Sequence, residues 1–216
     1  MTTLLRLQDV RVTIKGFVIL RGVSLEVAPG AAVGLVGRNG AGKTTTLRGI
    51  MGLVPVAAGS AAFDGRDLRS TPAHWRARLG IGYLPEDRRL VGSLKVRENL
   101  LLSAWATGMR DPERRLAAIL AEMPEVQELA GRQASGLSGG QQKMVGLARA
   151  LMVGSRLVLL DEPFEGLSPG LAQRLASVVR AFQGRGVSVL VAESDVNRAR
   201  YVAESIYTVE RGEIVG

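Results

Sequence analysis

The fold is decided by the stretch Ala32-Val33-Gly34-Leu35-Val36-Gly37-Arg38-Asn39-Gly40-Ala41-Gly42-Lys43-Thr44-Thr45. Its first five residues form an apolar run that predicts a buried strand, and residues 37–44 have the pattern G-x-x-x-x-G-K-T. A helix is expected to follow, from about Lys43 to Leu53. In this context the glycines let backbone N–H groups surround phosphate oxygens, and the helix N-terminus adds its positive dipole end. A purely structural glycine-rich turn is the alternative, which the flanking strand and helix disfavour.

This phosphate loop predicts individual roles for its residues. Lys43 is expected to reach the β- and γ-phosphates of a nucleotide, and the Thr44 hydroxyl to ligate Mg²⁺. The residues expected to bind the nucleotide are Gly37, Arg38, Asn39, Gly40, Ala41, Gly42, Lys43, Thr44 and Thr45.

A second motif ends another buried strand, where the run Leu157–Leu160 is followed by Asp161-Glu162-Pro163. In a parallel sheet these side chains emerge at the C-terminal edge, which is also where a phosphate loop lies. Asp161 is then expected to hold Mg²⁺, and Glu162 to act as the general base on the attacking water. An acidic pair at a strand end is by itself often only a turn. Together with a phosphate loop it indicates nucleotide hydrolysis.

A third motif, Leu137-Ser138-Gly139-Gly140-Gln141, precedes an expected helix over Lys143–Met152. A serine and two glycines before a helix make a second anion-binding helix start. The chain thus has two anion-binding helix starts but one pair of catalytic carboxylates. This suggests that one loop holds the nucleotide of its own subunit, while the other covers the nucleotide held by a partner subunit. The alternative is an ordinary helix cap formed by Ser138.

The remaining patterns predict an α/β fold. Continuous apolar runs are typical of parallel strands covered on both faces, and there are four: Val33–Val36, Ile81–Leu84, Leu157–Leu160 and Val187–Val191. Alternating runs predict half-exposed antiparallel strands near both ends: Leu5–Val12, Val23–Val27 and a hairpin of Ile206–Val209 with Ile214–Val215. Residues 95–132 have helical spacing, with a typical helix start at Asp111-Pro112-Glu113. We therefore expect a parallel-sheet core, an antiparallel β subdomain and an inserted helical subdomain.

Composition excludes several classes of protein. The 216 residues include no Cys and one His (His74), which excludes disulfide frameworks, thiol nucleophiles and His-rich metal sites. The net charge of +8 comes almost entirely from Arg spread along the chain, and the 4% aromatic content argues against single-stranded nucleic-acid binding. No apolar run approaches the roughly 18 residues of a membrane span, and the N-terminus lacks a signal-peptide pattern. We expect a chain that neither spans a membrane nor is exported.

In order and spacing, the three motifs resemble those of the ATP-binding cassette (ABC) ATPases, over essentially the whole chain. The resemblance implies a P-loop NTPase fold of the RecA-like type in a single ATPase domain, residues 1–216. Residues 1–94 and 133–216 would form the nucleotide-binding core, residues 95–132 the helical subdomain, and residues 137–141 the signature. It also implies ATP, Mg²⁺ and a head-to-tail dimer, in which Ser138, Gly139, Gly140 and Gln141 contact the ATP held by the partner.

A finer resemblance is to the ATPase subunits of branched-chain amino acid and related amide importers. It rests on the segments Gly82–Arg89, Val96–Leu100 and Asp161–Pro169. The implied partners are transmembrane permease subunits, a second ABC ATPase subunit and, indirectly, an extracytoplasmic solute-binding protein, with no nucleic acid. The implied location is the cytoplasmic face of the inner membrane, with the isolated chain soluble. For Trp105 in the helical segment, a partner-facing position and ordinary packing both stay open.

Four positions depart from the general pattern of the family. Glu86 stands where a glutamine is usual, Pro169 or a neighbour replaces the D-loop aspartate, Ser194 replaces the switch histidine, and Ile14 replaces the base-stacking aromatic, with Phe17 the nearest ring.

The expected catalytic residues are Glu162, Lys43 and Ser194, and the expected metal ligands are Thr44, Asp161 and Glu86. We predict that hydrolysis occurs. The alternatives are a nucleotide-gated cassette with weak hydrolysis beside an active partner and, less favoured, a soluble ATPase acting on nucleic acid.

Overall fold

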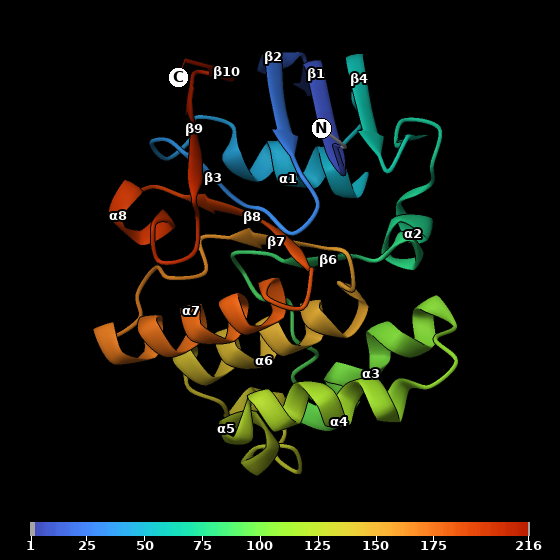
Figure 1. Cartoon of the computed structure of the whole chain (residues 1–216), viewed down its shortest axis with the longest axis vertical. Coiled ribbons are helices and arrows are strands. Elements are labelled where there is room, and N and C mark those ends of the chain that lie inside the picture. The colour runs from blue at the N-terminus through green and yellow to red at the C-terminus, as the bar shows by residue number, and fades with distance from the viewer. Residues whose placement is uncertain (1–2, 216) are drawn as a thin grey trace.

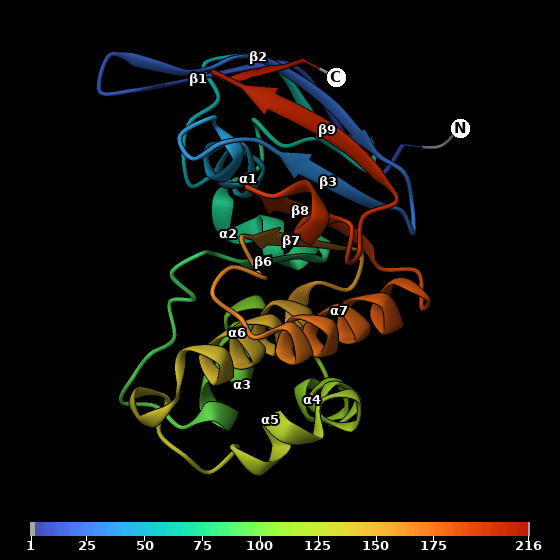
Figure 2. The ribbon, with the colours of Figure 1, turned by 90° about the vertical axis from the view of Figure 1, so that its left-hand side faces the viewer.

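The computed structural model describes residues 3–215 and arranges them in layers (Figures 1 and 2). An antiparallel sheet lies at one end, helix α1 separates it from a second sheet, and the remaining long helices cover the far face of that sheet. Both termini lie at the end formed by the antiparallel sheet. The α/β class predicted from the sequence is confirmed.

The antiparallel sheet has the strand order β2-β1-β4-β5. Its strands are β1 (Leu5–Ile14), β2 (Phe17–Val27), β4 (Ala58–Phe63) and β5 (Arg66–Asp67). Along β1 and β2, buried and exposed residues largely alternate, which confirms the two half-exposed strands predicted near the N-terminus. β4 and β5 were not predicted, because the small side chains of residues 58–62 carry little hydrophobic signal.

The core sheet has the strand order β10-β9-β3-β8-β7-β6. Its strands are β3 (Ala32–Val36), β6 (Ile81–Leu84), β7 (Leu157–Asp161), β8 (Ser188–Glu193), β9 (Ser205–Glu210) and β10 (Glu213–Ile214). The four continuous apolar runs form the parallel strands β3, β6, β7 and β8, as predicted. The C-terminal hairpin of β9 and β10 is also confirmed. However, β9 pairs in parallel with β3 on its other side, which the alternating pattern did not predict.

Helices cover both faces of the core sheet. They are α1 (Lys43–Met51), α2 (Ala73–Arg76), α3 (Val96–Thr107), α4 (Pro112–Glu122), α5 (Pro124–Glu128), α6 (Gly139–Val153), α7 (Pro169–Gln183) and α8 (Val196–Ala199), with 3₁₀ turns at Ala77–Leu79 and Ala134–Gly136. Asp111 caps α4 as predicted. α6 begins at Gly139, earlier than predicted, because Ser138 and Gln141 form a capping box. α7 was not predicted; its first residue is Pro169, which was considered, with its neighbours, for the D-loop position.

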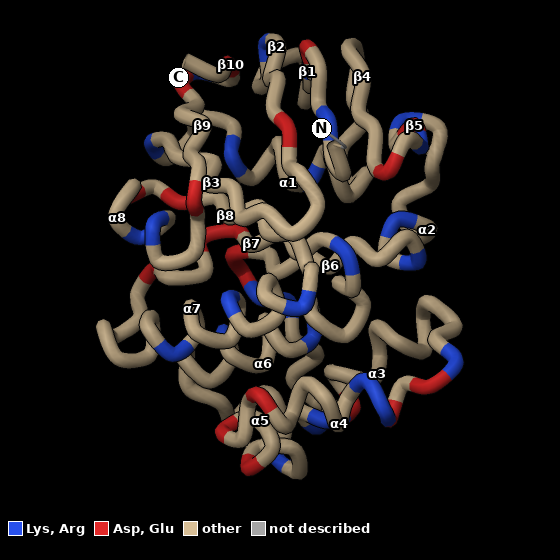
Figure 3. The backbone as a smooth tube through the Cα atoms, viewed as in Figure 1, with Lys and Arg blue, Asp and Glu red and all other residues tan. Residues whose placement is uncertain are grey.

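Two hydrophobic clusters divide the interior. One lies between the antiparallel sheet, α1 and one face of the core sheet. The other joins the opposite face of that sheet to the helices α3 to α7, so the segment 95–132 shares its core with α6 and α7. Among residues 3–215, no helix is both long enough and apolar enough to cross a bilayer. Lys and Arg are dispersed over all these layers (Figure 3).

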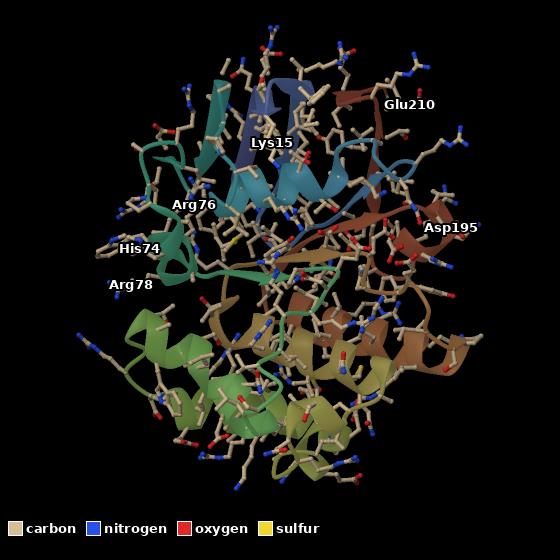
Figure 4. The ribbon with its side chains drawn as sticks, turned by 180° about the vertical axis from the view of Figure 1, so that it is seen from behind. Lys15, His74, Arg76, Arg78, Asp195 and Glu210 are labelled. Carbon is tan, nitrogen blue, oxygen red and sulfur yellow. The ribbon has the colours of Figure 1, made fainter. Side chains whose placement is uncertain are left out.

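A buried arginine ties α2 to the end of α1. The guanidinium of Arg76 donates to the carbonyl oxygens of Gly49 at 2.7 Å and Ile50 at 2.6 Å, the last turn of α1. A cation at a helix C-terminus is favourable because it meets the negative end of the dipole. In Figure 4, Arg76 is turned toward α1, whereas His74 and Arg78 lie on the outer side of α2. The helix that follows the phosphate loop is therefore anchored at its C-terminal end.

Candidate active site

The phosphate loop joins β3 to α1 and folds around the amino group of Lys43. The Nζ atom of Lys43 donates to the carbonyl oxygens of Gly37 at 2.7 Å and Arg38 at 3.3 Å. Gly42, just before α1, has a φ of +113°, and a Cβ there would lie 2.7 Å from a methyl group of Leu20. Glycine meets both constraints because it tolerates positive φ and has no side chain. The predicted strand–loop–helix arrangement is confirmed.

A pocket of about 420 Å³ opens over this loop. Lys43 and Thr44 line it from the loop, Glu86 from the segment after β6, and Glu162 from the segment after β7. These residues converge because parallel strands present their carboxyl ends at one edge of the sheet. Glu165, which no sequence pattern singled out, also lines the pocket.

The carboxyl group of Asp161 is buried between two hydroxyl groups. Thr44 Oγ1 donates to its Oδ1 atom at 3.0 Å, and the Tyr83 hydroxyl donates to its Oδ2 atom at 3.1 Å. Burial raises the pKa of Asp161; the two hydroxyl groups lower it, and the negative charges of Glu86 and Glu162 raise it, leaving it above the ordinary value. A cation beside Asp161 would favour the charged form instead.

The oxygen atoms at this edge of the sheet fit Mg²⁺, which takes hard oxygen ligands and is usually held by one or two carboxylates together with water and phosphates. Thr44 and the buried Asp161 already touch each other, and Glu86 lies at the exposed rim of the same pocket. These three side chains would hold the ion. When bound, Mg²⁺ would neutralise charge on the phosphate oxygens during transfer.

Glu162 is held in a constrained position. Its φ of +48° lies in the left-handed region, which is uncommon for a residue with a side chain. Lys43 Nζ lies 3.0 Å from its Oε1 atom in a buried ion pair, and the Ser194 N–H donates to its Oε2 atom at 3.2 Å. Burial raises the pKa of Glu162, but hydrogen bonds with Glu193, Lys43 and the Ser194 N–H outweigh burial and hold it below the ordinary value. A lowered pKa keeps this side chain ionised, as a general base requires.

Lys143 fixes the backbone beside Glu162, a role that sequence reasoning missed. Its Nζ atom donates to the carbonyl oxygens of Glu162 at 2.7 Å and Glu165 at 2.5 Å. Burial is the main cause that lowers the pKa of Lys143, and the nearby charge of Arg88 adds to it. The sequence signal that could have identified Lys143 is a single cationic residue on the otherwise apolar face of the predicted helix. Lys143 links the loop after β7 to α6.

Glu193 was also missed. It ends β8, is fully buried, and its Oε1 atom accepts a hydrogen bond from the Phe164 N–H at 2.9 Å. Burial raises its pKa to about 8, with a hydrogen bond to Glu162 acting in the same direction. An acidic residue at the end of an otherwise apolar strand was the signal that could have identified it.

The predicted signature residues lie at the start of α6 and outside this pocket. Ser138 Oγ accepts from the Gln141 N–H at 3.3 Å, and the Ser138 N–H donates to Gln141 Oε1 at 3.0 Å. Gly139 is exposed with open space around it, whereas Gly140 faces Leu171. The chain thus brings Lys43 and Glu162 together but leaves its signature facing solvent.

The hairpin between β1 and β2 carries the two residues considered for base stacking. Ile14 and Phe17 pair beside Lys15, which Figure 4 labels, and the Phe17 side chain is 73% exposed. The pocket is lined instead by Ile19 of β2. The apolar wall beside the phosphate loop is therefore aliphatic.

The segment after β8 holds Ser194 beside Glu162. Ser194 Oγ lies 3.4 Å from Glu162 Oε2, and the next residue, Asp195, caps the short helix α8 by accepting from the Asn197 N–H at 2.8 Å. Figure 4 shows Asp195 at the outer edge of the molecule. The structure thus places Ser194 against Glu162, with a hydroxyl group at the position where the family resemblance leads us to expect an imidazole.

Comparison with known proteins agrees with this geometry. Residues 20–165, more than half of the chain, match the ABC transporter family. The chain is 36% identical over 196 residues to the high-affinity branched-chain amino acid transport ATP-binding protein BraG of Pseudomonas aeruginosa, covering 91% of this chain and 84% of BraG. It is also 36% identical over 203 residues to the lipopolysaccharide export system ATP-binding protein LptB of Escherichia coli K12, covering 93% and 84%.

A solved structure shares the fold across nearly the whole length. It is a dimeric structure of a post-hydrolysis state of the ATP-binding cassette MJ0796 bound to ADP and Pi, with a TM-score of 0.87, 25% identity, and coverage of 98% of this chain and 97% of that one. The family resemblance found in the sequence is confirmed. The chain belongs to the ABC transporter ATPases and is an ATP-hydrolysing subunit of a transporter.

Proposed function

We propose that this ATPase powers an importer of branched-chain amino acids or a related small polar solute from the cytoplasmic face of the membrane. Its partners would be permease subunits, a second ATPase subunit and, indirectly, a solute-binding protein. The observation that carries the proposal is the segment Pro85-Glu86-Asp87-Arg88-Arg89, which resembles the P-E-G-R-R segment of such importers. The similarity to BraG supports the same substrate class.

Lipopolysaccharide export is a second candidate, because LptB is as similar to this chain as BraG is, at 36% identity. Both candidates use the same ATPase chemistry. They differ in the membrane partners that select the cargo.

The proposed chemistry follows from the positions of the side chains. The loop amides and Lys43 bind the phosphates, and Glu162 takes the proton of the attacking water. Ser138 and Gly139 of a second subunit cover the nucleotide, because each chain leaves its own signature facing solvent. Turnover by the purified chain alone would contradict the alternative of a cassette that depends on an active partner.

A groove beside the active site is the proposed docking place for a permease. Its volume is about 510 Å³, and it is lined by residues near the end of α1, by β6 and by parts of α3 and α6, including Arg48, Leu53, Tyr83, Arg89 and Arg149. Tyr83 lines this groove, and its hydroxyl donates to Asp161. A segment docked in the groove would therefore touch a residue that contacts the nucleotide site.

The Leu53→Glu variant is expected to bind the permease at least about tenfold more weakly, because the leucine contact with the docked segment is lost and a hydrated carboxylate takes its place. Leu53 is 54% exposed, so the isolated chain should keep its fold and basal ATPase rate. Affinity for the detergent-solubilised permease pair would be measured by biolayer interferometry. The matched control is Val215→Glu, which is equally exposed at 56% and lies outside the groove. Equal affinity of both variants would contradict the docking place.

Deletion of the gene is expected to abolish uptake of radiolabelled leucine, isoleucine or valine by the cells, because no ATPase would then drive the permease. Wild-type protein should restore uptake, and Glu162→Gln should not. If the deletion leaves amino-acid uptake normal and instead depletes lipopolysaccharide from the outer membrane, the proposed import function is wrong and lipopolysaccharide export takes its place.

A further inference from the structure

Two glutamates lie at the same level of the core sheet, Glu193 as the last residue of β8 and Glu162 directly after the adjacent strand β7. β7 and β8 pair in parallel with Asp161 opposite Ala192, and the Glu162 N–H donates to the Ala192 carbonyl at 2.9 Å. The next residues are Glu162 in one chain segment and Glu193 in the other. Glu193 is 0% exposed and Glu162 is 6% exposed, so both carboxyl groups are shielded from water.

Too few cations lie at this pair to balance the negative charge of two ionised carboxylates. Among the ion pairs of residues 3–215, one reaches Glu162, from Lys43 at 3.0 Å, and none reaches Glu193. The amino group of Lys143 is committed to backbone carbonyl oxygens, and Arg198 acts on Glu193 only through its charge. Two buried like charges with one paired cation are unfavourable, which favours the uptake of a proton by one of the two carboxyl groups.

The hydrogen bonds indicate which glutamate carries the proton. Glu162 already receives donors from Lys43 and from the Ser194 N–H. Glu193 has one donor, the Phe164 N–H on its Oε1 atom, while its buried Oε2 atom lacks a donor among the described residues. An ionised oxygen can only accept, whereas a protonated one can donate. The neighbouring acceptor is the Glu162 carboxylate, because Glu162 binds the N–H of Ser194, next to Glu193, and Glu193 binds the N–H of Phe164, two residues after Glu162.

We propose that Glu193 is a positioning residue for Glu162: its Oε2 atom carries a proton and donates it in a hydrogen bond to the Glu162 carboxylate. The inference rests on the proposed role of Glu162 as general base. Three donors, from Lys43, the Ser194 N–H and Glu193, then hold the base in one orientation toward the attacking water. Since the side chain of Ser194 offers only a hydroxyl, at 3.4 Å, Glu193 supplies a strong neutral side-chain donor in a site without an imidazole.

The test compares Glu193→Gln with Glu193→Met in the full chain. Glutamine can accept from the Phe164 N–H through its oxygen and donate to Glu162 through its nitrogen, as protonated glutamate does. Its kcat for ATP hydrolysis should stay within about threefold of wild type. Methionine has a similar volume without these polar atoms, so its kcat should fall at least about tenfold, with the ATP Kd within about twofold.

Equal loss of activity in Glu193→Gln and Glu193→Met would overturn the proposal, because it would show that Glu193 acts as an ionised group. Wild-type kcat in Glu193→Met would overturn it as well. If Glu193→Met unfolds in a thermal melt, Glu193→Asp replaces it, since a side chain shorter by one methylene withdraws the same proton donor and is expected to show the same drop in kcat. Glu162→Gln is measured in parallel: if that variant retains turnover, the general base is misassigned, a failure distinct from that of Glu193.

Discussion

Glu162→Gln is expected to hydrolyse ATP at least about a hundredfold more slowly than the wild type, because removal of a general base typically costs a factor of 10² to 10⁴. An amide cannot accept the proton of the attacking water. The change is isosteric, so Lys43 keeps its contacts with the carbonyl oxygens of the phosphate loop. ATP binding should therefore remain, and the ATP-bound dimer should accumulate because it no longer resolves through hydrolysis.

Phosphate release measures the turnover, and fluorescent ATP titration with light scattering measures binding and dimer mass. Glu128→Gln is the matched control, because Glu128 is an exposed residue of α5, far in sequence from the pocket residues. Turnover near the wild-type level in Glu162→Gln would mean that another group accepts the proton. Loss of ATP binding would instead mean that the ion pair with Lys43 organises the loop.

Gly139→Asp is expected to bind ATP normally and yet fail to hydrolyse it. A Cβ at Gly139 meets nothing within 4 Å in the chain itself, so the aspartate fits the isolated subunit. In a head-to-tail dimer it would place a carboxylate against the phosphates held by the partner, where like charges repel. Turnover should fall about a hundredfold, while ATP binding to the phosphate loop of the same chain is unchanged.

Mixing two defective variants tests whether the signature acts on a partner. Lys43→Ala destroys the phosphate loop and leaves the signature intact, so it should be inactive alone. A heterodimer of Lys43→Ala with Gly139→Asp has one intact site, made of one wild-type loop and one wild-type signature. The mixture should regain turnover that neither variant shows. Gly131→Asp, at another position with open space, is the control and should be active. Two results together would contradict the head-to-tail arrangement: verified heterodimers that regain no turnover, and weak ATP binding by Gly139→Asp alone. They would mean that the signature contributes to the nucleotide site of its own chain.

Much of the fold was predictable because its signals are local. The strands β3, β6, β7 and β8 were recognised since each is a continuous apolar run, and such runs arise where helices cover both faces of a sheet. The phosphate loop and the pair Asp161-Glu162 were recognised because their chemistry needs fixed residue types at fixed spacing. These features are complete within about a dozen residues, so no knowledge of distant contacts was necessary.

Other features depend on residues that only the folded chain brings together. β9 joined the core sheet by pairing with β3, although its alternating pattern fitted an antiparallel hairpin equally well. α7 packs against the core through an apolar face that was not distinguished from the loop before it. In both cases the local sequence is compatible with the observed element but also with other structures. The surface against which the element packs is formed by residues far away in the chain.

The sequence by itself determined that this protein folds as an α/β phosphate-binding ATPase, since the loop, the acidic strand end and the signature each carry their pattern in consecutive residues. Tertiary structure alone decided how the carboxyl groups of Asp161 and Glu162 are held. Tyr83 meets Asp161 across 78 residues, Lys143 reaches the Glu162 carbonyl across 19, and Glu193 meets Glu162 because two strands pair in register. Such contacts depend on distances in space, which residue spacing along a chain does not specify, and burial then sets the protonation of the groups involved.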